Sequence, residues 1–212
     1  MKTKIRFLLG NALAAVMDFG IGTALAAGIG TWYGVSLPWY LVCTGGVLSL
    51  LPDLDLVQSV IRGVSAPFDH RQTPFHRPLL VLPLAIGVAY LLGGEMWAVI
   101  AGVCVFGHYV HDTNFVGTSY GIAWFWPFSP QYWSVFVSFT PEVFESGSHH
   151  DWLRQNWLRP SLLSIREIGV GLVGFGIALW LMMVSPLMIL VVVLGAVASV
   201  YSFWIITRRS PL

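Results

Sequence analysis

The sequence has very little charge for its length. Of its 212 residues, only 10% are Asp, Glu, Lys or Arg, whereas 56% are apolar. A soluble domain carries about 25% charged residues, so this chain lacks the side chains that would cover a water-soluble globule. Its net charge of +1 excludes a strongly basic nucleic-acid-binding protein and an acidic disordered tail. We therefore expect an integral membrane protein that does not bind nucleic acid directly.

Cysteine and linker sequences are scarce as well. The two cysteines, Cys43 and Cys104, both lie within apolar runs, and two thiols do not make a disulfide framework. The chain contains no internal repeat and no low-complexity linker. We therefore expect residues 1–212 to form a single domain.

Apolar stretches predict an all-α membrane helix bundle. Crossing a hydrocarbon core about 30 Å thick takes about 20 helical residues. The second and third stretches contain Pro38 and Pro83 and are expected to be tilted, kinked or only partly inserted. The sequence thus predicts six transmembrane helices, with four as the alternative count. The stretches are residues 7–29, 32–51, 78–92, 96–111, 168–184 and 187–206.

Lys and Arg are absent from the connections that would face outward in the six-helix arrangement. All 11 basic residues lie instead in the inner segments, which are residues 1–6, 52–77, 112–167 and 207–212. Positively charged connections remain on the cytoplasmic side of a membrane. The asymmetry predicts a multi-pass protein of the inner (plasma) membrane with both termini in the cytoplasm.

The N-terminal segment allows two interpretations. A basic start and an apolar run ending in Ala24-Leu25-Ala26 are typical of a cleaved secretory signal. Asp18 does not belong in the apolar region of such a signal, which favours an uncleaved first helix. An acid at this depth is expected to face the bundle and to pair with another polar group.

Small residues recur along the fifth predicted helix, at Gly169, Gly171, Gly174 and Gly176. Glycines at such spacings allow helix backbones to approach closely in lipid. We interpret them as a packing surface.

The acidic pair Asp53 and Asp55 ends the second predicted helix, directly after Pro52. Two carboxylates at this spacing can converge on one cation, or they can face water where a helix stops. His70 and His76 precede the third helix. They can both reach a metal from one loop, or they can be interface residues of a basic loop.

His108 and Asp112 close the fourth predicted helix. They are four residues apart, so both side chains project from one helical face and can share one ion. A polar helix end at the bilayer surface is the alternative. His111 could act as a partner that orients a ligand or as a proton shuttle.

The positions of the three polar groups favour a common metal site. Because successive helices alternate in direction, all three should reach the same membrane face. His and Asp side chains suit zinc, or a two-metal centre of zinc, manganese or iron. The absence of cysteine from the groups favours an open catalytic site over a closed structural one. The predicted ligands are Asp53, Asp55, His70, His76, His108 and Asp112.

Arg71 and Arg77 flank these groups. A guanidinium is well suited to holding a phosphate, although both residues could simply anchor the loop at the cytoplasmic surface. We name Arg71 and His111 as candidate catalytic residues.

An aromatic-rich stretch follows the third group. Because Trp and Tyr favour the headgroup zone, it could lie in the interface and admit lipid to the site, or it could form a short buried helix. Residues 149–151, His-His-Asp, could bind metal or supply a base, or form a surface loop. The aromatic residues are Tyr120, Trp124, Phe125, Trp126, Phe128, Tyr132, Trp133, Phe136, Phe139 and Phe144.

The order of these motifs resembles a bacterial and archaeal family of inner-membrane metal-dependent hydrolases, some of whose members are described as LexA-binding. The likeness covers roughly residues 40–130, and there is a looser similarity to zinc-dependent phospholipase C. The resemblance implies a hydrolase, a divalent metal and a possible regulatory protein partner, without naming a substrate. The matching residues are Pro52, Asp53, Asp55, His70, Arg71, His76, His108, Asp112, Gly121, Trp126, Pro127 and Phe128.

The sequence as a whole favours a membrane-bound metal-dependent hydrolase that acts at the cytoplasmic face on a phospholipid or another phosphoester. A metal transporter or a scaffold for a regulatory partner is the alternative. Transporters place polar residues near the bilayer midplane, whereas here only Asp18 lies clearly deep. This distribution favours a surface metal site over a conduction path.

Overall fold

The computed structural model describes residues 2–56, 72–113, 121–134, 138–139, 153 and 156–209. In this part of the chain the fold is helical apart from one antiparallel pair of two-residue strands, β1 (Tyr132–Trp133) and β2 (Ser138–Phe139). The prediction of an all-α fold is therefore confirmed. The elements are α1 (Lys2–Ala14), α2 (Val16–Trp32), α3 (Trp39–Ser49), the 3-10 turns η1 (Leu51–Asp55) and η3 (Pro74–His76), α5 (Pro78–Gly93), α6 (Glu95–Asp112), α8 (Leu162–Leu181) and α9 (Pro186–Arg209).

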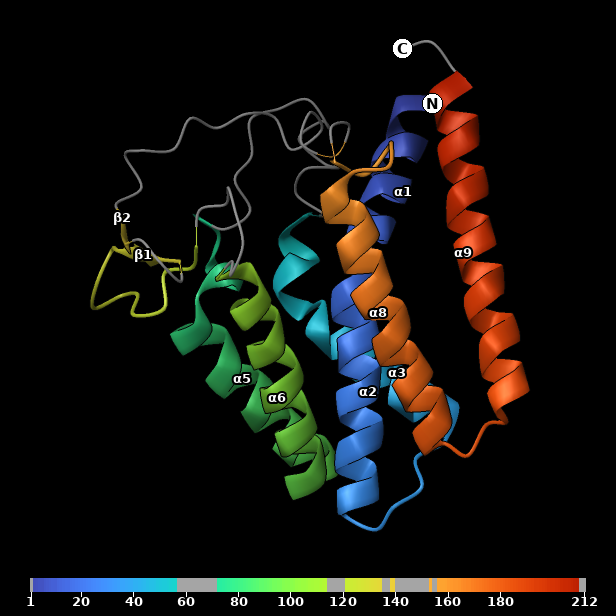
Figure 1. The fold of residues 1–212 in the computed structure, drawn as a ribbon. Helices are drawn as coiled ribbons and strands as arrows, with labels where there is room; N and C mark the ends of the chain where they lie inside the picture. Colours follow the sequence, from blue (N-terminus) through green and yellow to red (C-terminus); the bar gives the residue numbers. More distant parts are fainter. Residues whose placement is uncertain are drawn as a thin grey trace.

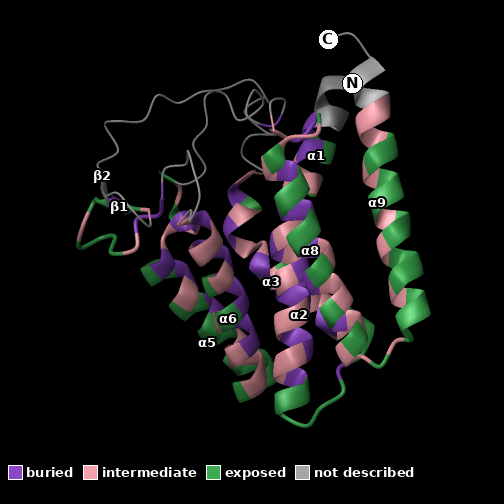
Figure 2. Cartoon of the chain, viewed as in Figure 1, coloured by how far each residue is buried: buried purple, intermediate pink, exposed green. Residues whose placement is uncertain are grey.

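Helix α2 is the centre of the bundle. It packs against α8, α3 and α6, and α6 in turn pairs with α5 as a hairpin (Figure 1). Helix α9 runs along one side of the molecule and exposes most of its surface (Figure 2). The core between α2, α3, α6 and α8 is made of small and branched side chains, including Ala26, Val42, Ile100 and Ala178.

The described residues contain fewer membrane spans than the six predicted. Only α8 and α9 are long and apolar enough to cross a membrane individually, and α1 with α2 would make a third span across a 40° bend. At a rise of about 1.5 Å per residue, the 11 residues of α3 reach only about 16 Å and the 16 residues of α5 only about 24 Å. Apolar composition was therefore a better guide to helix position than to helix length.

Close helix contacts in the bundle are made at glycine. A Cβ atom on Gly20 would lie 2.0 Å from the carbonyl oxygen of Gly171, and one on Gly22 would lie 2.4 Å from the carbonyl oxygen of Gly45. Gly174 meets the backbone of Gly20 in the same way, at 2.7 Å. The interpretation of Gly171 and Gly174 as a packing surface is confirmed.

Both chain termini lie at one end of the molecule (Figure 1). The α2–α3, α5–α6 and α8–α9 connections lie at the opposite end. The C-terminal ends of α3 and α6 and the start of α5 therefore reach the end that carries the termini. This alternation brings the polar groups that follow those helices together.

The aromatic segment is a folded loop rather than a helix over its described residues 121–134. Trp124 donates a hydrogen bond from Nε1 to Thr113 Oγ1 at 2.9 Å, which fastens the loop to the end of α6. Gly121 adopts φ +67°, and a Cβ there would lie 2.2 Å from the carbonyl oxygen of Trp133. The alternative of a short buried helix is thus wrong for this part of the segment.

Candidate metal centre

The polar groups converge at two short proline-initiated turns, η1 just after α3 and η3 just before α5. Pro52 lies in the first turn of η1 and Pro74 in that of η3, where the fixed φ of proline favours a tight turn and its missing N–H costs nothing. The two turns pack against each other and η1 packs against α6. Asp53 and His76 are thereby brought to the last turn of α6.

Ligand-type atoms of two histidines and two aspartates, from three segments, face one another. The Nε2 atoms of His76 and His108 each lie 3.7 Å from Asp53 Oδ1. The same two nitrogens lie 3.3 Å and 3.4 Å from Asp112 Oδ2. Asp53, His76 and His108 also offer ligand atoms that are all within 4.8 Å of one another. Both imidazoles thus face the same pair of carboxylates.

These spacings fit a tetrahedral metal ion. Zinc bonds of about 2.0–2.1 Å to nitrogen and oxygen place neighbouring ligand atoms about 3.4 Å apart at tetrahedral angles. The four measured separations between His nitrogens and Asp oxygens run from 3.3 to 3.7 Å. They exceed the usual length of a strong N–H···O hydrogen bond, although Asp112 remains within weak hydrogen-bonding distance of both imidazoles. Both ring nitrogens of His108 lack a hydrogen-bond partner among the described residues, although its side chain is only 2% exposed.

Asp55 lies behind His76. Its Oδ2 atom is 3.1 Å from His76 Nδ1 and also accepts a hydrogen bond from the hydroxyl of Thr73. A carboxylate bonded to the second ring nitrogen fixes the tautomer and orientation of a histidine that binds metal through the first. The sequence predicts Asp55 as a direct ligand, whereas this geometry places it to orient His76.

Asp18 has an equivalent place behind His108. Its Oδ2 atom lies 3.6 Å from His108 Nδ1, and both carboxylate oxygens lie 3.1 Å from His111 Nδ1. The expectation that Asp18 faces the bundle and pairs with a polar group is confirmed. This contact is compatible with either predicted role of His111, a partner that orients a ligand or a proton shuttle.

The polar chain continues to α8. His111 Nε2 lies 3.6 Å from Glu167 Oε1, and Glu167 also accepts a hydrogen bond from Arg166 at 3.2 Å. Sequence reasoning did not single out Glu167 or Thr73. The argument that selected Asp18, a buried acid in an apolar helix, applies equally to Glu167, which is 7% exposed.

Burial governs the electrostatics of the centre. His76 and Asp55 are fully buried. Burial raises the pKa of Asp53 to about 6, against the opposing effect of the neighbouring imidazoles of His108 and His76. Burial alone would lower the pKa of His76, but hydrogen bonds and charges from Asp112 and Asp55 outweigh it and raise that pKa. The cluster concentrates negative charge that a divalent cation would offset.

Two predicted site residues, His70 and Arg71, lie outside the described residues, as does the His-His-Asp run at 149–151. Arg77 lies beside the cluster, directly after His76, with its guanidinium against the aromatic loop. Of the six predicted ligands, the structure therefore brings together five: Asp53, Asp55, His76, His108 and Asp112.

Replacing Asp55 with asparagine should weaken metal binding without abolishing it. The amide cannot act as a carboxylate acceptor for His76 Nδ1, and loss of such a partner typically lowers metal affinity about 10–100-fold. Zinc titration against a competing chelator would measure this. A zinc affinity unchanged from the wild-type protein would show that Asp55 does not orient His76.

The chain matches a protein-family model. The model described as YdjM inner membrane protein matches residues 14–206, which include every described residue of the centre. The chain belongs to the YdjM inner membrane protein family. No curated protein and no solved structure matches it. The YdjM match agrees with the apolar helices and supports a place in the inner membrane, while its printed description names no reaction.

Proposed function

We propose that this YdjM-family protein is a membrane-bound, metal-dependent hydrolase with zinc as its metal. One observation carries the proposal: the Nε2 atoms of His76 and His108 both face the carboxylates of Asp53 and Asp112, at separations of 3.3–3.7 Å. Manganese or iron could occupy the same donor set. A site without cysteine suits catalysis better than a purely structural role.

Each residue of the cluster has a role in the proposal. Asp53, His76, His108 and Asp112 would hold the metal, which when bound would lower the pKa of a water toward 7 and polarise a phosphoryl oxygen. Asp55 fixes the ring of His76 through Nδ1.

Asp18 lies 3.6 Å from His108 Nδ1, too far for a hydrogen bond, and would act on His108 through its charge. His111 would link Asp18 to Glu167 on α8, with its Nδ1 atom 3.1 Å from Asp18 and its Nε2 atom 3.6 Å from Glu167.

The proposed location of the centre is the cytoplasmic face of the inner membrane. The chain termini, with Lys2 and Lys4 near one and Arg208 and Arg209 near the other, lie at the same end as the centre (Figure 1). The opposite-end connections contain no Lys or Arg. This asymmetry supports a multi-pass arrangement with both termini inside, in which α3 and α5, too short to cross the core alone, would be partly inserted members of the proposed set of six.

The proposed substrates are phosphoesters, including membrane phospholipids. Detergent-purified protein with added zinc should hydrolyse bis-p-nitrophenyl phosphate, measured by release of nitrophenolate. EDTA and His108→Ala should each reduce the rate at least 100-fold, because both remove the metal. Cys104→Ala, one turn earlier on α6, is the matched control and should retain activity.

Two outcomes would contradict the proposal. A rate unaffected by EDTA or by His108→Ala would show that the centre does not perform the reaction. Stoichiometric zinc with no hydrolysis of phosphodiesters, phosphomonoesters or phospholipids would instead favour a metal transporter or a scaffold.

A further inference from the structure

Arg77 is held in an aromatic setting next to the metal centre. Its guanidinium carbon lies 5.7 Å from the ring centroid of Trp126 and 5.4 Å from that of Tyr132. Its Nη2 atom donates to the Tyr132 hydroxyl and to the Gln72 carbonyl oxygen, each at 3.0 Å. Two rings and two hydrogen bonds therefore fix the orientation of this cation.

The guanidinium of Arg77 lacks an anionic partner among the described residues. No carboxylate of that part of the chain forms an ion pair with it, in contrast to Arg166, which pairs with Glu167 at 3.2 Å. The Nη1 atom is buried and has no hydrogen-bond partner there either. A fixed, half-buried guanidinium whose Nη1 donors have no partner in this part of the chain is suited to binding a phosphate or carboxylate.

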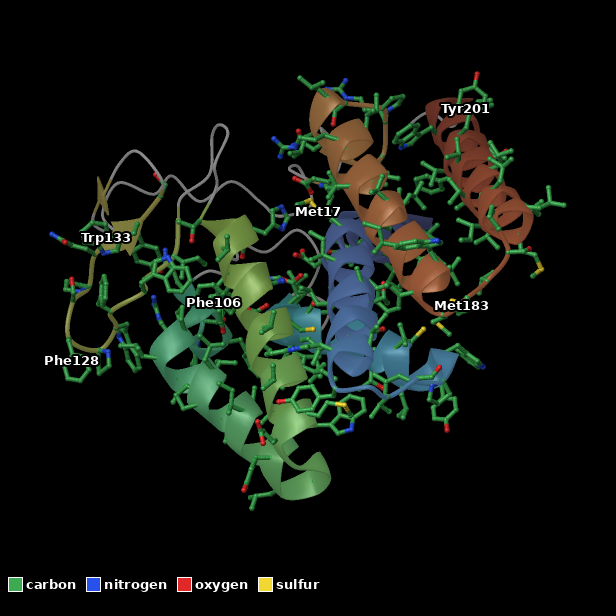
Figure 3. All side chains as sticks on the ribbon, turned by 60° about the horizontal axis from the view of Figure 1, so that its bottom comes forward. Met17, Phe106, Phe128, Trp133, Met183 and Tyr201 are labelled. Carbon is green, nitrogen blue, oxygen red and sulfur yellow. The ribbon has the colours of Figure 1, made fainter. Side chains whose placement is uncertain are left out.

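The surface around Arg77 favours a lipid as the source of that anion. On the same loop, Phe125 is 52% exposed and Phe128 is 87% exposed. Figure 3 shows Phe128 at the outer part of the loop, on the side of the molecule that carries α5. The first turns of α5, which begins directly after Arg77, expose Leu79 and Leu80. Exposed apolar side chains on the two segments that carry Arg77 and its aromatic neighbours match a molecule with acyl chains and a charged headgroup.

We propose that Arg77, with Trp126 and Tyr132, binds the phosphate of a membrane phospholipid headgroup. His76 of the metal centre is the residue directly before Arg77, so the two α-carbons are about 3.8 Å apart. The proposed phosphate site and the candidate centre therefore share one backbone segment. The part of this inference that makes the phospholipid a substrate rests on the proposed function, whereas the binding itself does not need the metal.

The test is a calorimetric titration of dihexanoyl phosphatidylglycerol into the EDTA-treated full-length protein in detergent. Arg77→Gln should weaken binding at least tenfold. Tyr132→Phe, which keeps the ring and removes the hydroxyl that holds the guanidinium, should weaken it severalfold. Arg159→Gln is the matched control, because it removes an equal charge from an exposed position outside the aromatic loop, and it should bind within twofold of wild type.

Two further probes identify the source of the phosphate. Dihexanoyl glycerol, which lacks phosphate, should not bind measurably, and inorganic phosphate should bind at least tenfold more weakly than the lipid. Inorganic phosphate that binds as tightly as the lipid would overturn the lipid assignment. Equal lipid affinity in Arg77→Gln and wild type would overturn the site. Arg77→Lys is a second variant that guards against misfolding, because it keeps the charge. It should still bind the lipid severalfold more weakly than wild type.

The outcome is separable from that of the proposed function. Loss of lipid binding in Arg77→Gln is measured without metal, and zinc content is measured without lipid. Zinc binding in a protein whose lipid affinity does not depend on Arg77 would refute this inference alone. Arg77-dependent lipid binding in a protein that never binds zinc would refute the proposed function alone.

Discussion

His108→Ala is expected to remove stoichiometric metal from the protein. His108 Nε2 faces both Asp53 and Asp112, so its loss removes one of the four proposed donors. The two carboxylates would then face only the imidazole of His76. Metal content should fall from near one equivalent to below about a tenth in mass spectrometry of detergent-purified protein reconstituted with zinc. Asp112→Ala should have a similar effect, because Asp112 Oδ2 faces both imidazoles.

The control for this prediction is Cys104→Ala. Cys104 is a buried thiol on the same helix that could bind a soft metal adventitiously. Its replacement should leave the metal content unchanged. If His108→Ala retained a full equivalent of zinc, or if wild-type protein held none after gentle purification and reconstitution, the proposed centre would be refuted.

Gly171→Ala is expected to destabilise the protein strongly, although it lies away from the centre. The added Cβ would lie 2.3 Å from the carbonyl oxygen of Val16 and 2.9 Å from the α-carbon of Met17, so backbone rather than a flexible side chain must move. Overpacking typically costs about 1–3 kcal/mol and occasionally more. A clear drop in the thermal unfolding midpoint in detergent should follow, with part of the protein aggregating during purification.

Gly169→Ala is the matched control for helix propensity. It lies on the same helix two residues earlier, and a Cβ there would meet nothing within 4 Å. The added methyl group should leave the unfolding midpoint unchanged or raise it slightly, because alanine favours helix over glycine by about 1 kcal/mol. Equal midpoints for Gly171→Ala and Gly169→Ala would contradict the close approach of α2 and α8.

The ligand-type residues of the candidate centre could be found from the sequence. Charge is so rare in this chain that each His and Asp in an apolar setting is conspicuous. Their convergence could be inferred because helices alternate in direction. Spacing alone could not separate Asp53 from Asp55, since both follow Pro52 and only the packing of η1 against η3 turns Asp53 toward both imidazoles and Asp55 toward His76 Nδ1.

Asp18 contacts His111, which lies 93 positions further along the chain. His111 in turn contacts Glu167, which lies 149 positions after Asp18. Contacts at such separations are set by how helices pack and leave no local pattern in the sequence. The same reason explains why two of the four predicted glycines of α8, Gly171 and Gly174, make the close contacts with α2, whereas Gly169 and Gly176 do not.

By itself, the sequence determined the membrane class, the helical fold and the face on which polar residues gather, because composition, apolar runs and the placement of basic residues are properties of local sequence. The tertiary structure alone decided which helices are long enough to span, which carboxylates face the imidazoles, and that Arg77 lies between Trp126 and Tyr132. Those features depend on where turns end helices and on the close approach of backbones at glycine, and both are set by the packing of distant segments.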